Sequence, residues 1–418
     1  MLEAAAPGVS FLRLDTFIVR RVITGSPRPA RRTHLSLPRY GALLSAGLAL
    51  TGLQLLLLPR WLTAFDFGLV VLSVSVTQAI LQFGDLGLSR LSIDSGRPAD
   101  EQASLRNHGQ ALTIMTVGAF LGVLSALWFL TRAHSVLLLA LALGALAAVA
   151  VSGDKYRAAL NEVAGDEAGA ANHNFLWTNA SKAGLIAGAV FVHAAVPILA
   201  AGTLTGAALC APYWAPLRRA LPVVKAYRLW ALPVASVLSP FVIGWADTYF
   251  LTAHLGIASG GSYQALYRLL AVTTYLYLPW GSVVSSRVNA RETRPLLRPT
   301  LMALGATAAG LAVATAFAVV VAPWFFPNFR LPLAALPSLL ALNLLSPLSY
   351  CFGTALYARA NVLAIASANV AGMVLVLVGH TLFTLHGTPA TAATVSLAGM
   401  AVATAGQMWA YLRAGRSV

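Results

Sequence analysis

Residues 67–84 read FGLVVLSVSVTQAILQFG, a segment without a charged side chain. About 20 predominantly apolar residues in a helix cross the hydrocarbon core of a bilayer. The polar side chains in and just after this segment follow one another at helical spacing and share an arc of roughly 80°. They are Ser75, Gln78, Gln82 and Asp85. The pattern predicts a transmembrane helix with one polar face.

The whole chain has the composition of a membrane protein. Of 418 residues, 58% are hydrophobic and 10% are charged, and the mean hydropathy is +0.75. Soluble domains average about 25% charged residues, so a soluble fold of this chain would expose too much apolar surface to water. Cys210 and Cys351 both lie in apolar segments and offer neither a disulfide framework nor a zinc site. We expect a polytopic membrane protein without a metal or cofactor.

The apolar segments are long and numerous enough for about twelve transmembrane helices. We place them near residues 40–58, 67–84, 110–130, 136–153, 174–192, 196–214, 230–252, 262–284, 300–322, 333–353, 361–383 and 390–411. The connections on the outer side are all short. The longer inner loops, near 85–109 and 154–173, contain acidic residues such as Asp154 but no phosphate-binding glycine loop.

Positive charges fall mainly on one side of the predicted membrane. If residue 1 is cytoplasmic, the inner loops hold 23 of the 28 Lys and Arg residues and the outer loops hold three. Cytoplasmic loops normally carry this excess. The net charge of +15 therefore reports topology and not a nucleic-acid partner, and we expect both termini in the cytoplasm.

A basic linker over residues 215–229 divides the spans six and six. Halves with an even number of spans enter the membrane in the same orientation, as parallel repeats do. We predict an N-terminal lobe over 40–214 and a C-terminal lobe over 230–411. The flanking segments are a basic cytoplasmic tail over 1–39 and a short cytoplasmic tail over 412–418.

A charged side chain inside a bilayer usually faces a cavity or a partner, because its burial in lipid is costly. Lys182 lies on a polar arc of the fifth span, which predicts a cavity cation; the alternative is a side chain that reaches the inner headgroups. The stripe with Gln78 and Gln82 predicts a cavity wall or, alternatively, interhelical hydrogen bonds. Asp85 either continues that wall or emerges at the cytoplasmic surface.

Asp247 and Arg268 lie at equal depth on antiparallel neighbouring spans, about 9 Å from the outer surface. They can form an ion pair that only fixes two helices, or Asp247 can serve in ion coupling. Arg268 shares an arc of about 120° with Tyr267 and Tyr275. A guanidinium on an aromatic face rich in hydroxyl groups suits phosphate oxygens and sugar rings. Trp245 lies nearer a span end, where an aromatic belt is expected, and receives no role in the site.

Three segments carry a resemblance to a known family. They are FDFGLVVLSVSVTQAILQFGDLGLSR at 65–90, WADTYFLTAHLG at 245–256 and YQALYRLL at 263–270. They resemble the polysaccharide and O-antigen flippases of the multidrug, oligosaccharidyl-lipid and polysaccharide (MOP) exporter superfamily. The resemblance implies an all-α polytopic membrane fold of about twelve transmembrane helices, in two six-helix lobes around a central cavity, similar to the MATE transporters.

The resemblance also implies a function. Such a flippase moves an undecaprenyl-pyrophosphate-linked oligosaccharide across the bacterial inner membrane by alternating access, for O-antigen, capsule or exopolysaccharide synthesis. By this analogy Lys182 and Arg268 hold the pyrophosphate. The residues near the sugars are then Gln78, Gln82, Tyr267 and Tyr275. Besides membrane lipids, the implied partners are a polysaccharide polymerase and glycosyltransferases.

Two other functions stay open. A cation-coupled multidrug exporter of the same superfamily would place carboxylates in an otherwise apolar cavity, whereas this chain offers Asp247 and two cavity cations. A membrane-embedded glycosyltransferase or polymerase would need an acid–base constellation at the outer face, and the outer loops hold Asp66 alone. We therefore expect a protein that is not an enzyme.

Overall fold

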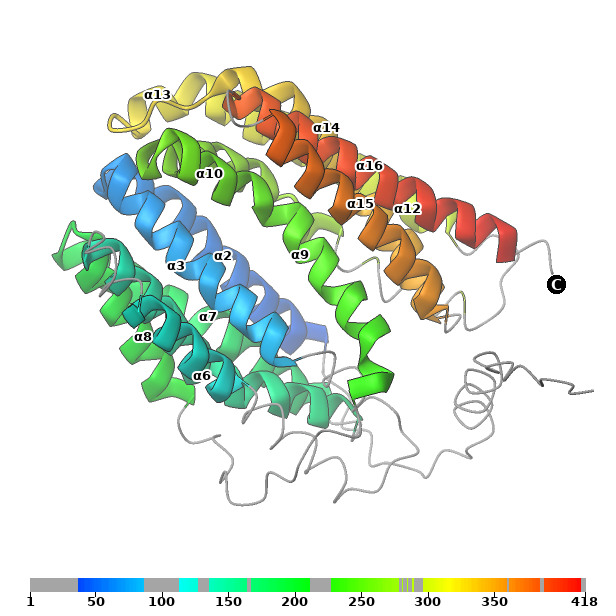
Figure 1. Ribbon diagram of the computed structural model, residues 1–418, viewed down its shortest axis with the longest axis horizontal. Helices are drawn as coiled ribbons and strands as arrows, with labels where there is room; N and C mark the ends of the chain where they lie inside the picture. The colour runs from blue at the N-terminus through cyan, green and yellow to red at the C-terminus, as the bar shows by residue number, and fades with distance from the viewer. Residues whose placement is uncertain are drawn as a thin grey trace, which may run out of the picture.

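The chain folds as an assembly of long helices (Figure 1). The structure is a computed structural model that describes residues 37–85, 113–126, 135–163, 167–210, 227–277, 280, 284, 288, 296–358, 361–383 and 387–414. These residues contain no strand, and each of the twelve spans predicted from the sequence overlaps a helix in the described residues. The predicted tail over 1–39 and the linker over 215–229 lie almost entirely outside the described residues.

The helices form two packed groups. The N-terminal group consists of α2 (Leu37–Trp61), α3 (Ala64–Asp85), the helix Thr113–Ala126, α6 (Ser135–Val163), α7 (Glu167–Phe191) and α8 (Ala195–Cys210). The C-terminal group consists of α9 (Tyr227–Leu255), α10 (Ile257–Ala271), α12 (Leu297–Ala316), α13 (Ala322–Phe325), α14 (Leu336–Ala358), α15 (Val362–Phe383) and α16 (Pro389–Ala414). A π-helical turn, Phe317–Val321, joins α12 to α13, and a short 3₁₀ turn, Leu333–Ala335, precedes α14.

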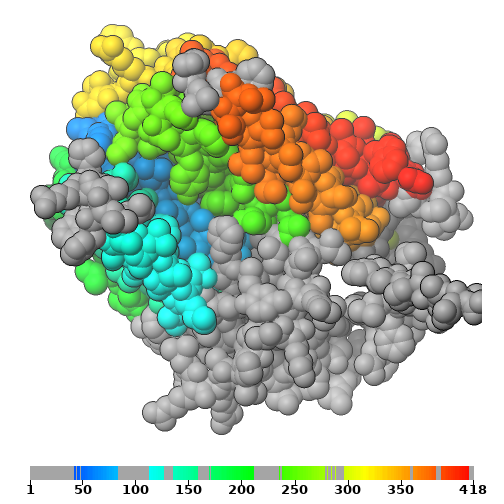
Figure 2. Space-filling view, in the orientation of Figure 1, coloured from blue at the N-terminus to red at the C-terminus, as the bar shows by residue number. Residues whose placement is uncertain are grey.

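Much of the helical surface is apolar. Within the described ranges, five helical segments are long and apolar enough to cross a membrane: Ala64–Gln82, Ser135–Ala158, Leu297–Phe325, Leu333–Tyr357 and Val362–Leu382. The shorter apolar helix Thr113–Ala126, cyan in Figure 2, lies on the surface, where Met115 and Val123 are exposed. Exposed apolar faces on helices of this length are stable against lipid and not against water. The chain is therefore a membrane protein.

Short polar contacts fix the ends of several helices. Thr63 caps α3, because its Oγ1 accepts a hydrogen bond from the Asp66 backbone N–H (3.1 Å) and donates to Asp66 Oδ2 (2.6 Å). Asp66 Oδ1 also accepts from the Ala195 backbone N–H at the start of α8, at 3.2 Å. Gly256 joins α9 to α10 with a φ of 88°, a conformation that a residue without a Cβ adopts at no steric cost.

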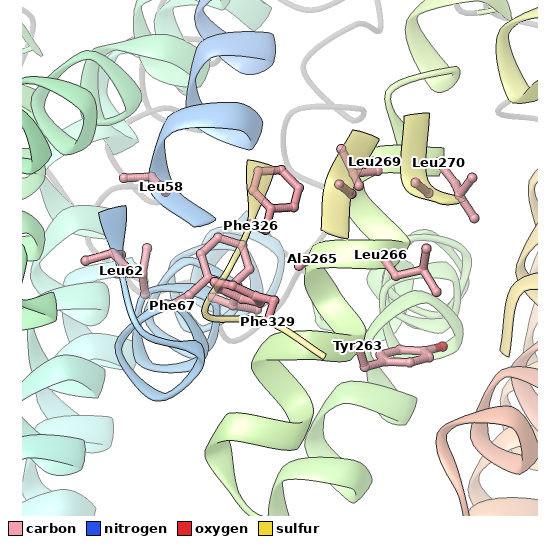
Figure 3. Packing of buried hydrophobic residues seen from close by; sticks show 14 of the residues in the cluster. Leu58, Leu62, Phe67, Tyr263, Ala265, Leu266, Leu269, Leu270, Phe326 and Phe329 are labelled. Carbon is pink, nitrogen blue, oxygen red and sulfur yellow. The ribbon is translucent and has the colours of Figure 1, made fainter. Parts of the chain in front are cut away.

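An apolar core joins the two groups at the end of the molecule where α3 and α10 begin, which we call the packed end. Its buried side chains include Leu58, Leu62, Phe67, Leu266, Phe326 and Phe329. Figure 3 shows Phe67 of α3 close to Phe326 and Phe329, which follow α13. The rings of Phe67 and Phe329 meet edge to face with centroids 5.5 Å apart. Apolar burial therefore holds the two groups together at this end.

Glycines allow α3 and α10 to approach closely at the packed end. A Cβ atom at Gly68 would collide with the carbonyl oxygen of Ile257, and one at Gly261 would collide with the carbonyl oxygen of Ala64. Small residues at such crossings let membrane helices pack backbone against backbone. The relative position of the two groups thus depends on these two glycines.

Asp154 corrects a prediction about the inner loops. The sequence placed this residue at the start of a loop, but α6 continues to Val163 and Asp154 is fully buried. Its Oδ1 atom lies 2.5 Å from His173 Nδ1 on α7, and its Oδ2 atom has no hydrogen-bond partner among the described residues. A buried carboxylate requires such a partner. Apolar length alone could not reveal it, since the imidazole comes from another helix.

Gly261→Ala should weaken the packed end. The added methyl group meets the backbone of Ala64 and Gly68, and overpacking of this kind costs about 1–3 kcal/mol. The matched control is Gly244→Ala in α9, where a Cβ atom meets nothing within 4 Å. Thermal unfolding of the purified protein in detergent should give a lower midpoint for Gly261→Ala only. Equal midpoints would contradict the close approach of α3 and α10.

His173→Phe should lower the free energy of unfolding by about 3–5 kcal/mol, because the buried Asp154 carboxylate loses its imidazole partner and keeps, among the described residues, only the weak thiol donor of Cys210. Adding Asp154→Leu to His173→Phe should recover much of this loss, since no buried charge then remains. Unfolding titrations in mixed detergent micelles measure both variants. If the double variant is as unstable as His173→Phe, the unpaired Asp154 carboxylate is not the cause of the lost stability.

Candidate functional site: a cationic cavity between the helix groups

A cavity of about 380 Å³ lies between the two groups of helices. One wall comes from α2, α3, α6, α7 and α8, and the other from α9, α10 and the residues that follow α10. Its polar and aromatic lining consists of Thr51, Gln54, Ser73, Thr77, Gln78, Trp177, Thr178, Ser181, Lys182, Thr203, Trp245, Gln264, Tyr267, Arg268, Thr274 and Tyr275. Cavities of roughly 300–1,000 Å³ are typical of ligand sites.

The structure places most of the predicted site residues together. Those that line the cavity are Lys182, Arg268, Gln78, Tyr267 and Tyr275. Gln82, one turn beyond Gln78 on α3, is partly buried and is not part of the lining. Asp247 is buried behind the cavity wall. Asp85 is the last residue of α3, and its side chain lies outside the description.

Several residues of the cavity were missed from the sequence; Ser73, Thr77, Trp177 and Thr203 are among them, and so are the three that follow. Thr51 and Gln54 of α2 face the cavity, and their spacing of three in an otherwise apolar helix was the available signal. Trp245, which the sequence assigned to an aromatic belt, also lines the cavity. Its position in a belt or in a cavity depends on the orientation of α9, which the sequence of α9 alone does not determine.

The cavity lining is cationic. Lys182 of α7 contributes one positive charge and Arg268 of α10 contributes another, so each helix group supplies one cation. The lining residues in the described part of the chain include no aspartate or glutamate. Two positive charges in a low-dielectric cavity without a counter-charge attract anions more strongly than the same charges in water.

Thr51 connects Lys182 to the opposite wall. The Lys182 ammonium donates to Thr51 Oγ1 at 3.0 Å and to Asn179 Oδ1 at 3.3 Å. Thr51 donates its own hydroxyl hydrogen to the Gly47 carbonyl (2.8 Å), and its oxygen lies 3.2 Å from the Tyr275 hydroxyl. Tyr275 therefore donates to Thr51, and the two helix groups are hydrogen-bonded inside the cavity.

Arg268 is held by an amide and an indole. Its Nε–H donates to Gln264 Oε1 at 3.3 Å, one helical turn earlier on α10. Its guanidinium carbon lies 5.6 Å from the centre of the Trp245 ring, a cation–π distance. Within the described part of the chain no acidic group forms an ion pair with Arg268. The described residues accept no hydrogen bond from the remaining guanidinium N–H groups, which can therefore bind a ligand in the cavity.

Three threonines on the N-terminal wall present only acceptor oxygens. Thr77 donates its hydroxyl hydrogen to the Gly144 carbonyl (2.7 Å), Thr178 to the Asn174 carbonyl (2.5 Å) and Thr203 to the Leu199 carbonyl (2.9 Å). A hydroxyl group has a single hydrogen, so lone pairs remain for the cavity. This wall accepts hydrogen bonds, whereas Lys182 and Arg268 donate them.

Asp247 does not form the ion pair that its depth permitted. It is 1% exposed, its Oδ2 atom accepts from the Tyr263 hydroxyl at 2.5 Å, and its Oδ1 atom accepts from the Thr248 backbone N–H at 2.6 Å. Thr248 Oγ1 donates to the same Oδ1 atom at 3.2 Å. Arg268 and Asp247 are therefore bonded to different partners.

Comparison with known proteins identifies the fold. No protein-family profile and no curated protein matches the sequence. An outward-facing multidrug resistance MATE family transporter of the MOP superfamily aligns over 100% of both chains, with 16% identity and a TM-score of 0.58. An inward-facing transporter of the same description aligns over 93% of this chain and 98% of that chain, with 15% identity and a TM-score of 0.57.

A MOP superfamily transporter from Pyrococcus furiosus aligns over 98% of both chains, with 15% identity and a TM-score of 0.58. At these identities the alignments report the fold alone. The predicted all-α fold class, similar to that of MATE and other MOP transporters, is confirmed.

Proposed function

We propose that this chain is a transporter of the MOP type that moves a pyrophosphate-linked oligosaccharide on a polyprenyl lipid between membrane leaflets. The observation that carries the proposal is the cavity with Lys182 and Arg268 and no acidic residue among its described lining. A pyrophosphate needs several charge-assisted donors, and guanidinium and ammonium groups supply them. One cation from each helix group lets a bound anion contact both groups at once.

The hydroxyl groups support a sugar beside the anion. Sugars carry many hydroxyl donors, and Thr77, Thr178 and Thr203 offer them acceptor oxygens. The opposite wall adds Tyr267 and Trp245, whose aromatic faces pack well against sugar rings. A polar head group in this cavity avoids contact with hydrocarbon, while its polyprenyl chain can stay in the lipid.

The alternative is a multidrug exporter that is coupled to a cation. The fold is equally consistent with it, since two of the matched structures are multidrug resistance transporters. The charge of the cavity disfavours cationic drugs, which Lys182 and Arg268 would repel. The Pyrococcus furiosus transporter is described as having a binding pocket of reverse polarity that suggests a different function. Because a transporter of similar fold is described in this way, we base the proposed substrate on the charge of the cavity and not on the fold.

Location, partners and energy coupling complete the proposal. The excess of positive charge on the predicted inner loops favours a bacterial inner-membrane protein with both termini in the cytoplasm. A polysaccharide polymerase and glycosyltransferases would be its partners in surface-polysaccharide synthesis. Asp247, a buried carboxylate in the C-terminal group, is the candidate for ion coupling.

Proteoliposomes that contain the purified protein should flip a polyprenyl-pyrophosphate-linked oligosaccharide that carries a fluorophore. Dithionite added outside reduces the fluorophore of the molecules in the outer leaflet, so the extent and rate of fluorescence loss measure flipping. Lys182→Met and Arg268→Met should each slow flipping about tenfold to a hundredfold, because a hydrogen bond to a charged group contributes about 1.5–3 kcal/mol. Arg268→Lys should keep part of the activity, since the charge remains while the planar fork is lost.

The control is Arg413→Met, which removes an exposed cation on α16 that contacts Trp409 and does not line the cavity. It should flip the lipid at the wild-type rate. Wild-type protein that exports a lipophilic cation such as ethidium but flips no lipid-linked sugar would replace this proposal with the drug exporter.

A further inference from the structure

A directed chain of hydrogen bonds connects the buried Asp247 to the cavity cation Arg268. The Arg268 Nε–H donates to Gln264 Oε1 at 3.3 Å, and Gln264 Nε2 donates to Thr248 Oγ1. Thr248 Oγ1 donates to Asp247 Oδ1 at 3.2 Å. Every link has its donor on the Arg268 side and its acceptor on the Asp247 side.

The direction of this chain follows from the chemistry of its members. Arg268 has only donors, and an ionised Asp247 has only acceptors. Thr248 gives its single hydroxyl hydrogen to Asp247, so it can only accept from Gln264. The Gln264 amide must then turn its nitrogen toward Thr248 and its oxygen toward Arg268. A reversed amide would place two donors against each other at Arg268.

The side chains between Arg268 and Asp247 that form this series of hydrogen bonds are buried in the protein. Asp247, Thr248 and Gln264 are each 1% exposed. On its other side Asp247 faces the hydroxyl groups of Tyr263 on α10 and Ser396 on α16. His380 of α15 lies beyond Ser396, with Nε2 3.5 Å from its Oγ. Hydrogen bonds between buried groups of low local dielectric are stronger than in water and polarise one another, so a change at Asp247 can reach Arg268 through them.

We propose that Thr248 and Gln264 are positioning residues that transmit the charge of Asp247 to Arg268. This inference rests on the proposed function, because it gives the coupling carboxylate a physical connection to the anion site. With Asp247 ionised, the hydrogen bonds through Thr248 and Gln264 hold the Arg268 side chain near Gln264 and offset part of the positive charge of Arg268. With Asp247 neutral, the pull weakens and Arg268 binds an anion in the cavity more tightly. Ion binding at Asp247 and anion binding at Arg268 are then linked reciprocally.

The first test is a double-mutant cycle with inorganic pyrophosphate as the probe, measured by calorimetry on the full chain at one fixed pH. Asp247→Asn mimics the neutral carboxyl group and should tighten pyrophosphate binding about tenfold, within the range of about 5–150-fold that is usual for coupled sites. Thr248→Val keeps the shape of Thr248 and removes its hydroxyl group. In the Thr248→Val background, Asp247→Asn should change the affinity less than about twofold, as for independent sites.

The matched control is Thr273→Val. Thr273 is also 1% exposed, but its hydroxyl group donates to the Leu270 carbonyl and takes no part in the chain. Thr273→Val should leave the effect of Asp247→Asn intact. An undiminished effect of Asp247→Asn in the Thr248→Val background would overturn the transmission, because the two charges would then interact through space.

A second test needs no ligand. The unfolding midpoints of Asp247→Asn, Arg268→Met and their double variant should be non-additive in the wild-type background and additive with Thr248→Val. Additive midpoints in both backgrounds would overturn the transmission. If this test succeeds while the wild-type protein binds no pyrophosphate, the anion site and the proposed function fail and the transmission stands. If pyrophosphate binds but neither cycle depends on Thr248, the transmission fails and the anion site stands.

Discussion

The bilayer offers no water to a buried polar group, so each ionisable side chain must find its partner inside the protein. This chain meets the requirement in three different ways. Lys182 and Arg268 face a cavity, and Asp247 is surrounded by the hydroxyl and amide donors of Tyr263 and Thr248. Asp154 is paired with His173 on a neighbouring helix. The packing of the helices places each of these ionisable side chains next to its partner or next to the cavity.

The packed end and the cavity depend on each other. Phe67, Phe326 and Phe329 fill the interface at the end where α3 and α10 begin, and Gly68 and Gly261 bring the two backbones together there. The same two helices carry Gln78 and Arg268 farther along their length, where they line the cavity. A close crossing near one end of two helices fixes their separation along the rest of their length. The distance between the wall that carries Arg268 and the hydroxyl-rich wall is thus set by packing outside the site.

Features that repeat along one helix could be predicted from the sequence. The apolar length of each span, the polar stripe through Gln78, and the arcs that carry Lys182 and Arg268 all follow from a helical period of 3.6 residues. Contacts between side chains on different helices could not be predicted, even where the two helices follow one another in the sequence. The pair of Asp154 and His173 needs two helices at one particular rotation. The same holds for Trp245, whose place in the cavity depends on how α9 faces α10.

The substrate class rests on charge, because the fold does not select it. Helices arranged in this way occur in transporters described as multidrug resistance transporters and in one described as having a binding pocket of reverse polarity. Within one fold, a change from a carboxylate to an ammonium group at a lining position inverts the sign of the charge that a ligand must carry. In this chain Lys182 and Arg268 come from opposite walls, and both lie within reach of donors or acceptors that a ligand can replace. Under the proposed function, an anion would exchange those contacts for its own oxygens and contact both helix groups, so that its binding would favour one relative position of the two groups.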